Sequence, residues 1–401
     1  MHLSFLRDYH EALVIALART TPTIERGMVA DVTGLTPQAV SKVLARLVEE
    51  GVIVPAGVRR PALGKPATVY RLVPDSRWAI GAHVTRRAVR LALTDLAGTV
   101  RASTTTSLPA DFTPDQLLTH LAAGVEGMTT EHHLFPERKP AQPPAAGHSQ
   151  PRPGLEATRA SATDQTGTST ATRLGRRLVG VGIGMIGPLD QASGMVRDAH
   201  GLRHWHDVPL ADLAEKRLGL PVLVDKDVTA GVTAEAWRCG AGFRDAALVL
   251  VETGIGAGLW LSGAAHRGTH TNAGEFGHTV VQLDGPPCVC GRHGCLEAVH
   301  NRATDPAAAA AAAVLATGVI NLLQTLDLGH VVLAGSDLLR HGAVYHQTVE
   351  RAVRTQVPRA DWLTVNVTLT SLGTDVIAAG AAMQVLNARY GLPDPTRLRV
   401  P

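Results

Sequence analysis

A chain of 401 residues is too long for one ordinary hydrophobic core, so its length predicts two or three domains. Apolar residues make up 45% of the chain, aromatic residues only 3%, and there are 40 glycines, which indicates a globular α/β protein rich in Ala, Val and Leu. The net charge of +3 is too small to indicate a chain that binds nucleic acid over its whole surface, so any such contact must come from a local basic patch.

From the sequence we predict neither a secretory signal nor a membrane-spanning run. The N-terminus carries Asp8 and Glu11 where a secretory signal needs an uninterrupted apolar core. We find no later run that approaches the roughly 20 apolar residues needed to cross a bilayer. We therefore expect a cytoplasmic protein with no membrane contact. Three of its four cysteines lie within eight residues, which fits a metal site better than disulfides and leaves Cys239 as an expected buried thiol.

The N-terminal segment has the pattern of a helix-turn-helix. Residues 3–19 place apolar side chains at helical spacing, and a second short helix is expected over residues 25–32. Gly34 then supplies a turn, Thr36 a helix cap and Pro37 the first helical residue. The next helix, up to residue 50, has one apolar stripe, so its other face should point outward. That outward face comprises Gln38, Ser41, Lys42, Ala45 and Arg46.

Two short β-type runs, residues 51–57 and 67–73, flank the basic segment VRRPALGKP, as expected of a hairpin with a long charged loop. Helix, turn, helix and hairpin in this order predict a winged helix-turn-helix domain over residues 1–75. The helix over residues 38–50 could reach base edges in a major groove while the wing neutralises phosphates. A small helical cap with a solvated face is the alternative. The predicted DNA contacts are Gln38, Ser41, Lys42, Arg46, Arg59, Arg60 and Lys65.

The remainder of the chain predicts an α/β domain over residues 76–401 with one insert. Residues 131–177 are rich in Pro, Ser, Thr, Ala and charge and lack apolar periodicity, so we expect them to form a disordered insert. From residue 178, strand-type and helix-type runs alternate. The main runs are LVGVGIGM, LADLAEKRLGL, PVLVDKD, VTAGVTAEAW, AALVLVETGIGAGLWLSG, a helix over residues 307–326, and HVVLAGSDLL.

Four side chains with metal-ligand chemistry cluster within eighteen residues. Nine residues separate His278 from Cys288, one separates Cys288 from Cys290, and four separate Cys290 from Cys295. One imidazole and three thiolates complete a tetrahedral shell with no open position, so the spacing predicts a structural rather than a catalytic Zn²⁺. Reduced cysteines without a metal are the alternative.

The stretch GEFGH followed by CVCGRHGCLEA resembles the signature of the ROK family, which unites bacterial sugar kinases with sugar-responsive transcriptional repressors. The segments GVGIGMIGPLD, LRHWHDVPLADLAEKRLGLPVLVDKD and TGIGAG resemble family segments in the same order, so the likeness covers most of residues 76–401 apart from the insert. LTPQAVSKVLARLVEEGVI and GKPAT resemble the winged helix and linker of the repressor branch. The resemblance implies an actin-like, ribonuclease H-like fold of two α/β lobes, preceded by the winged helix-turn-helix domain.

The resemblance also implies a sugar site. It places sugar contacts at Glu275, His278 and Glu297, with His278 joining the zinc to the sugar pocket. Asp227 falls where family kinases keep their catalytic base, and we count it among the sugar-binding residues. An Asp at a strand end could deprotonate a sugar hydroxyl that faces a γ-phosphate, but it is equally suited to recognition without chemistry.

The chain departs from the kinase pattern at two places. Family kinases carry an Asp-x-Gly-Gly-Thr phosphate loop after the first strand, whereas here AIGAHVTRRAVRLAL brings His83, Thr85 and Arg86 to that place. These bulky residues should block or misplace ATP, which leaves Asp227 as a vestigial base and TGIGAG as either a nucleotide loop or a strand-packing turn. The family's usual Asn before the Asp is replaced by Lys226, which could pair with an acidic or phosphorylated sugar or point to solvent.

These features predict a sugar-responsive DNA-binding transcriptional regulator, a repressor of carbohydrate-use genes, that is not an enzyme. Its partners would be operator DNA and a small-molecule sugar or sugar derivative, and it would act as a homodimer or homotetramer. Two alternatives stay open. Asp227 and TGIGAG favour an ATP-dependent sugar kinase with an appended DNA-binding domain. Lys226 and a segment after Glu297 that is shorter than in the family favour a degenerate regulator that senses no sugar.

Overall fold

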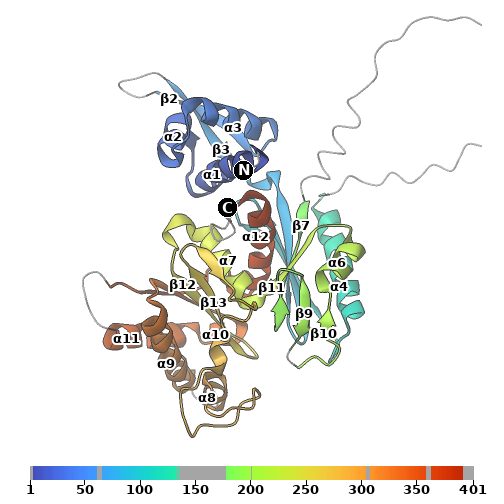
Figure 1. Ribbon diagram of the computed structural model, residues 1–401, viewed down its shortest axis with the longest axis vertical. Helices are drawn as coiled ribbons and strands as arrows, with labels where there is room; N and C mark the ends of the chain where they lie inside the picture. Colours follow the sequence, from blue (N-terminus) through green and yellow to red (C-terminus); the bar gives the residue numbers. More distant parts are fainter. Residues whose placement is uncertain are drawn as a thin grey trace, which may run out of the picture.

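The computed structural model describes seven stretches of the chain: residues 3–60, 66–132, 134, 178–199, 201–303, 308–357 and 363–391. Of the insert predicted over residues 131–177, all but residues 131, 132 and 134 lies outside this described part, as does Lys65 of the predicted wing. The described elements form an N-terminal unit on top of two α/β lobes (Figure 1).

The N-terminal unit contains the three predicted helices: α1 (Leu3–Thr20), α2 (Arg26–Thr33) and α3 (Pro37–Glu49). Gly34 ends α2 with a φ of 70°, a left-handed conformation that glycine adopts without strain. The Oγ1 of Thr36 accepts a hydrogen bond from the backbone N–H of Ala39 at 3.2 Å, so the predicted cap of α3 is confirmed. The buried stripe of α3 is Val40, Val43, Leu44 and Leu47.

A small antiparallel sheet completes this unit. It has the order β1 (Ile24–Glu25), β3 (Ala67–Leu72) and β2 (Ile53–Arg59), so the predicted hairpin is present and gains a two-residue third strand. The 3₁₀ turn η1 (Pro74–Ser76) leads from the hairpin into the first lobe.

Each lobe is built on a five-stranded sheet with the same topology. In both sheets three strands form an antiparallel meander, and two further strands add in parallel beside the first strand of that meander. The first sheet has the order β11 (Val222–Lys226), β7 (Leu178–Met185), β4 (Trp78–Val84), β5 (Ala88–Asp95), β6 (Val100–Ser107). The second has the order β14 (Ala264–His266), β13 (Ile255–Leu261), β12 (Ala246–Val251), β15 (His330–Ala334), β16 (Asn366–Leu369).

The outer faces of the two sheets carry separate helices. In the first lobe these are α4 (Pro114–Glu131) and α6 (Leu210–Leu218), next to the small sheet of β8 (Leu189–Asp190), β9 (Met195–Asp198) and β10 (His206–Val208). In the second lobe they are α8 (Leu296–Ala303), α9 (Ala308–Leu326), α10 (Ser336–Leu339) and α11 (Gly342–Gln356). The turns η2 (Gly240–Gly242), η3 (Phe276–His278) and η4 (Gly373–Asp375) lie in loops.

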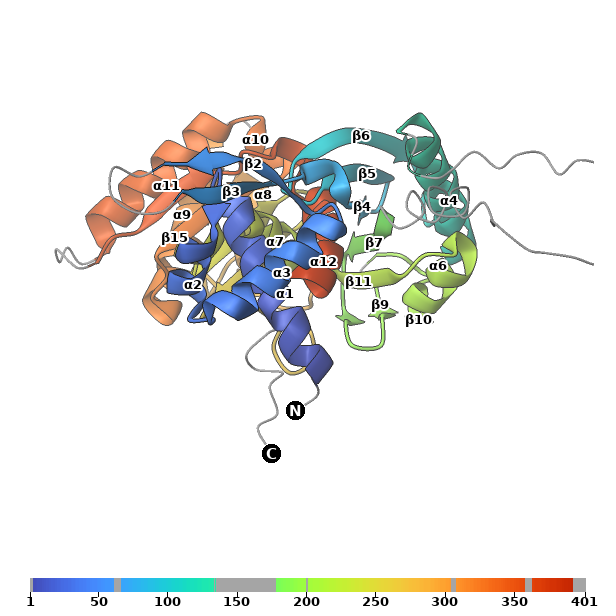
Figure 2. The same ribbon diagram turned by 90° about the horizontal axis from the view of Figure 1, so that it is seen from above.

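Two helices fill the space between the sheets, and each crosses to the other lobe. Helix α7 (Asp227–Cys239) follows the last strand of the first sheet but packs on β13 of the second, whereas α12 (Val376–Tyr390) follows the second sheet and packs on β4 and β7 of the first. Figure 2 shows both helices between the lobes and below the N-terminal unit. They approach each other so closely that a Cβ added to Gly380 would lie 1.8 Å from the carbonyl oxygen of Ala230.

Two sequence predictions are wrong at this level. Helix α9 is an apolar segment of 19 residues with a mean hydropathy of 1.7, so one run does reach the length and composition of a membrane span. Eight of its residues are buried in the core of the second lobe, which explains the apolar run as a core helix. Cys239 is exposed rather than buried because it is the last residue of α7 and lies beyond the buried stretch Val228–Trp237.

We expect Gly380→Ala to lower the free energy of unfolding by about 3 kcal/mol, because the new methyl group overpacks a contact between two backbones. Urea unfolding followed by circular dichroism measures this difference. Gly127→Ala is the matched control, since a Cβ at this exposed position of α4 meets nothing within 4 Å and should stabilise the helix by about 0.5–1 kcal/mol. Equal stabilities of Gly380→Ala and the wild type would contradict the close approach of α7 and α12.

Candidate metal centre and sugar site

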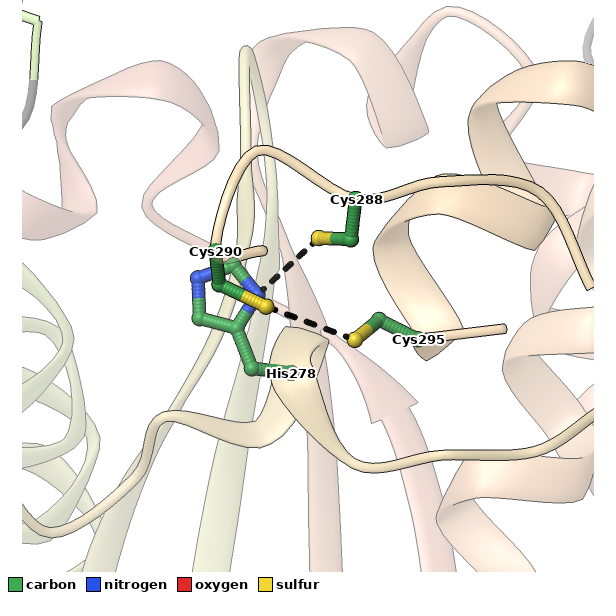
Figure 3. Close-up of side chains that lie close together, drawn as sticks. All are labelled: His278, Cys288, Cys290 and Cys295. Atoms are coloured by element: carbon green, nitrogen blue, oxygen red, sulfur yellow. Dashed lines mark hydrogen bonds between the residues drawn. The ribbon is translucent and has the colours of Figure 1, made fainter. Parts of the chain in front are cut away.

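The four predicted metal ligands converge at the end of η3 and in the loop before α8 (Figure 3). One ligand atom from each of His278, Cys288, Cys290 and Cys295 lies within 4.8 Å of all the others. The Nδ1 of His278 is 3.5 Å from the Sγ of Cys288, and the Sγ atoms of Cys290 and Cys295 are 3.6 Å apart. Backbone pairing between Val280 and Cys295 closes the loop on itself.

These separations fit a tetrahedral Zn²⁺. Zinc–sulfur bonds of about 2.3 Å and zinc–nitrogen bonds of about 2.0–2.1 Å require sulfurs about 3.8 Å apart and a nitrogen about 3.6 Å from a sulfur. Both values agree with the observed distances to within about 0.2 Å. The structure therefore contains a Cys₃His cluster consistent with a zinc site, and the described part of the chain contains no second such group.

The thiols of this cluster differ in environment. The pKa of Cys290 is lowered to about 6, chiefly because the backbone N–H of Arg292 donates to it, whereas burial raises the pKa of Cys295 to about 12. A Zn²⁺ ion would bind both sulfurs as thiolates and remove this difference. Its role would be to tie η3 to the start of α8, and these two segments carry Glu275 and Glu297.

Replacing Cys290 with Ser should release the zinc, because the shell loses one of its four ligands. We expect about one zinc per chain in the wild type, substantially less in the variant, and a lower melting temperature for the variant. Metal content is measured by inductively coupled plasma mass spectrometry and stability by calorimetry. Cys239→Ser is the matched control, since this exposed thiol lies outside the cluster. A wild type that is purified with no bound metal and gains no stability from added zinc would contradict the site.

The structure brings together the segments that hold the four residues expected to bind sugar. Glu297 accepts a hydrogen bond at 2.8 Å from the backbone N–H of Ile255, which lies in the Gly-rich turn TGIGAG (residues 253–258) and is the first residue of β13. The backbone N–H of Ala257 donates to the carbonyl oxygen of Gly274, next to Glu275. Asp227 is the first residue of α7 and lies beside the same turn, because a Cβ on Gly256 would touch the side chain of Val228.

Lys226 points neither to solvent nor to an open pocket. Its side chain is buried, and its Nζ donates to Oε1 of Glu275 at 2.6 Å and to the carbonyl oxygen of Ala273 at 3.1 Å. This ion pair fixes Glu275 beside the residue that precedes Asp227 and neutralises one of the carboxylates of the candidate sugar site. Sequence reasoning missed the pair because its members are 49 residues apart and lie on different elements.

A second buried polar group, His83, lies close to Asp227. His83 is only 4% exposed on β4, its Nε2 lies 3.8 Å from Oε2 of Glu252, and burial lowers its pKa to about 4. Burial also raises the pKa of the carboxyl groups of Asp227 and Glu252, and the backbone N–H of Val228 and the Lys226 ammonium oppose this rise at Asp227. A neutral imidazole therefore occupies the end of β4, at the place where the sequence lacks the phosphate loop of family kinases.

The Gly-rich turn TGIGAG serves packing. A Cβ on Gly258 would lie 1.9 Å from the carbonyl oxygen of Val228, and one on Gly256 would lie 2.8 Å from its side chain. The glycines therefore let β13 lie directly against α7, which favours the strand-packing interpretation of this turn. Thr85 and Arg86 form the turn between β4 and β5, where the Oγ1 of Thr85 accepts the backbone N–H groups of Arg87 and Ala88.

The predicted DNA-contacting face is only partly free. Gln38, Ser41 and Lys42 are exposed on α3 as expected. Arg46 is not turned outward: it is half-buried and paired with Glu11 of α1, which packs against α3. On the wing, Arg59 is exposed but forms a two-pronged ion pair with Glu25, whose contact lowers the pKa of that carboxyl. Arg60 is exposed.

Comparisons with known proteins agree with this architecture. A family model described as "ROK family" matches residues 150–304. A putative xylose repressor of Caldicellulosiruptor sp. (strain Rt8B.4) is 26% identical over 295 residues, which cover 73% of this chain and 64% of that protein. A glucokinase of Thermotoga maritima is 41% identical over 120 residues, which cover 30% of this chain and 38% of the enzyme. The chain thus spans less than two thirds of the length of either curated relative.

Solved structures give the same fold. The crystal structure of a ROK family transcriptional regulator, a homologue of the Escherichia coli MLC protein, superposes with a TM-score of 0.68 at 18% identity and covers 96% of this chain and 98% of that one. A ROK family glucokinase from Streptomyces griseus, in complex with glucose and AMPPNP, gives a TM-score of 0.56 at 21% identity and covers 76% of this chain and 98% of the enzyme.

Fold and site define a two-lobed α/β protein with an N-terminal helical unit and a Cys₃His cluster of the zinc type. Residues 150–304, which include the signature stretch, match the ROK family model, and the fold is that of a ROK family transcriptional regulator.

Proposed function

We propose that this protein is a sugar-responsive transcriptional regulator, a repressor of carbohydrate-use genes that a sugar effector releases from DNA. The observation that carries the proposal is the combination of an exposed polar face on a capped helix, α3, with a carboxylate-rich site between two lobes. The similarity to a putative xylose repressor and to the fold of a ROK transcriptional regulator supports it.

The winged helix-turn-helix domain over residues 1–75 would bind DNA. Gln38, Ser41 and Lys42 would contact base edges in the major groove, and Arg59 and Arg60 would contact phosphates from the wing, together with Lys65. Because Arg46 is held by Glu11, its role would be to orient α3 more than to contact DNA directly. The operator would be an approximate palindrome read by a homodimer or homotetramer in the cytoplasm.

The domain over residues 76–401 would bind the effector. Asp227, Glu275 and Glu297 would accept hydrogen bonds from sugar hydroxyls, and His278 would bind zinc through Nδ1 while its other ring nitrogen faces the sugar. Since Lys226 already neutralises Glu275, and the remaining carboxylates repel anions, the structure favours a neutral sugar over the acidic or phosphorylated ligand that Lys226 alone suggested. The zinc would be structural.

The sugar and DNA sites should respond to separate substitutions. We expect Glu297→Gln to lower sugar affinity about 10-fold or more, because a hydrogen bond to a charged group contributes about 1.5–3 kcal/mol, while operator binding stays intact. Gln is preferred to Ala because it keeps an acceptor for the N–H of Ile255. Fluorescence anisotropy on DNA from upstream of the coding region, at fixed salt and with D-xylose or D-glucose, measures both properties.

Lys42→Ala should weaken operator binding at every sugar concentration by about 1–3 kcal/mol and relax the preference for the operator sequence, because a contact to a base edge is lost. Lys216→Ala, an exposed lysine on α6 far from α3, is the matched control. An Lys42→Ala variant that binds operator as the wild type does, or a wild type that binds no DNA specifically, would overturn the assignment.

An ATP-dependent sugar kinase with an appended DNA-binding domain is the second candidate, favoured by Asp227 at the start of α7 and by the glucokinase similarity. The buried pair of His83 and Glu252 argues against a phosphate site at the end of β4. We therefore expect no sugar-dependent ADP release with D-glucose or D-xylose in a coupled assay. ADP release that Asp227→Asn abolishes would establish the kinase instead.

A further inference from the structure

The N-terminal unit is attached to the lobes through an unusual buried contact at the end of α1. The guanidinium carbon of Arg19 lies 3.3 Å from the centre of the Trp237 ring, and Arg19 also donates a hydrogen bond to the carbonyl oxygen of Trp237. Trp237 belongs to the last turn of α7, whose carbonyl groups have no partner within the helix. A cation at this position is favoured by the helix dipole and by the aromatic face.

This contact is tight but incompletely satisfied. Neither Nε of Arg19 nor Nε1 of Trp237 has a hydrogen-bond partner among the described residues, although both atoms are buried. Burial lowers the pKa of Arg19 to about 9. Buried donors without acceptors cost free energy. The observed contact is therefore less stable than a fully paired one, and less free energy is needed to reach an arrangement in which water binds these donors.

Helix α1 also contacts α3, the proposed recognition helix. Glu11, two turns before Arg19 on α1, is paired with Arg46 of α3. At the other end of the connection, α7 begins at Asp227 in the candidate sugar site and is buried along Val228 to Trp237. A helix of this length spans about 20 Å, so α7 and α1 together join the two proposed binding sites through rigid elements.

A continuous apolar core supports this path. One cluster of buried residues runs from Val14, Ile15 and Ala18 of α1 into α7 and α12 without interruption. Thr20 also lies against Gly240, directly after α7, where an added Cβ would be 2.8 Å from the threonine methyl group. The second junction is different in kind: Arg77 donates to the hydroxyl of Tyr390 at 2.8 Å and contacts Glu50, so it is fully paired.

We propose that α1 couples the sugar site to the recognition helix, with Arg19 as the positioning residue that holds α1 on the end of α7. The proposal rests on the proposed function and deepens it. Sugar bound at Asp227 shifts α7, Trp237 moves against Arg19, and α1 carries Arg46 and α3 to a new orientation while Arg77 and Tyr390 act as the pivot. The sugar site and the DNA site are coupled because ligands at both sites change the equilibrium position of the same helix, α1.

The experiment compares full-length wild type with Arg19→Ala and Arg19→Lys. For each protein, the operator affinity is measured with and without D-xylose or D-glucose, and the sugar affinity is measured separately by calorimetry. Arg19→Ala should bind sugar within about twofold of the wild type, yet the ratio of its two operator affinities should fall towards 1. Arg19→Lys keeps the positive charge but loses the planar guanidinium group that stacks on Trp237. Its ratio of operator affinities should therefore lie between those of the wild type and Arg19→Ala. Arg197→Ala, which removes an exposed arginine paired with Asp207, should leave the ratio unchanged.

Amide hydrogen exchange of the same proteins without sugar or DNA provides a test that does not depend on the effector. Exchange in Arg19→Ala should rise in residues 3–20 and in the last turn of α7, but not in α4 or α11. Unchanged exchange in residues 3–20, or a wild-type ratio of operator affinities in Arg19→Ala, would overturn the proposal. A wild type that binds no DNA or responds to neither sugar would instead contradict the proposed function, and the exchange measurement would still decide the role of Arg19.

Discussion

The two lobes are held together by direct contact between backbones. Gly380 of α12 meets Ala230 of α7, Gly258 of β13 meets Val228, and Gly182 of β7 meets α12, at distances that leave no room for a Cβ. Dispersion and burial act here across main chains, which have no rotamers to adjust. Such an interface cannot deform gradually, so a displacement of α7 has to move the residues at both of its ends.

The candidate site inherits its geometry from this packing. Asp227 starts α7, the Gly-rich turn lies against Val228, and Glu297 is fixed by the backbone of Ile255 in the next strand. The zinc-type cluster then ties the segment of Glu275 to the start of α8. Asp227 and Glu297 are therefore positioned by packed helices and strands, and Glu275 is positioned by its ion pair with Lys226, an arrangement that would suit the proposed recognition of sugar hydroxyls.

Local signals in the sequence were sufficient for local structure. The cap at Thr36, the stripe of α3 and the spacing of the Cys₃His cluster each depend on residues close together in the chain, and all three are present in the structure. Pairs between distant segments could not be predicted, because Lys226 finds Glu275 and Arg46 finds Glu11 only after the chain has folded. Helix α12 was missed because it is buried on all sides and Ala-rich, and so has no polar face to reveal its period.

The exchange of helices between the lobes also affects the order in which the protein can be completed during synthesis. The first sheet is finished at residue 226, yet most of the face of β4 and β7 is covered by α12, residues 376–390, near the end of the described chain. Until that helix leaves the ribosome, an apolar surface lined by Gly81 and Gly182 stays open to other chains. Aggregation of the nascent chain is therefore a risk that this topology creates independently of the stability of the finished fold.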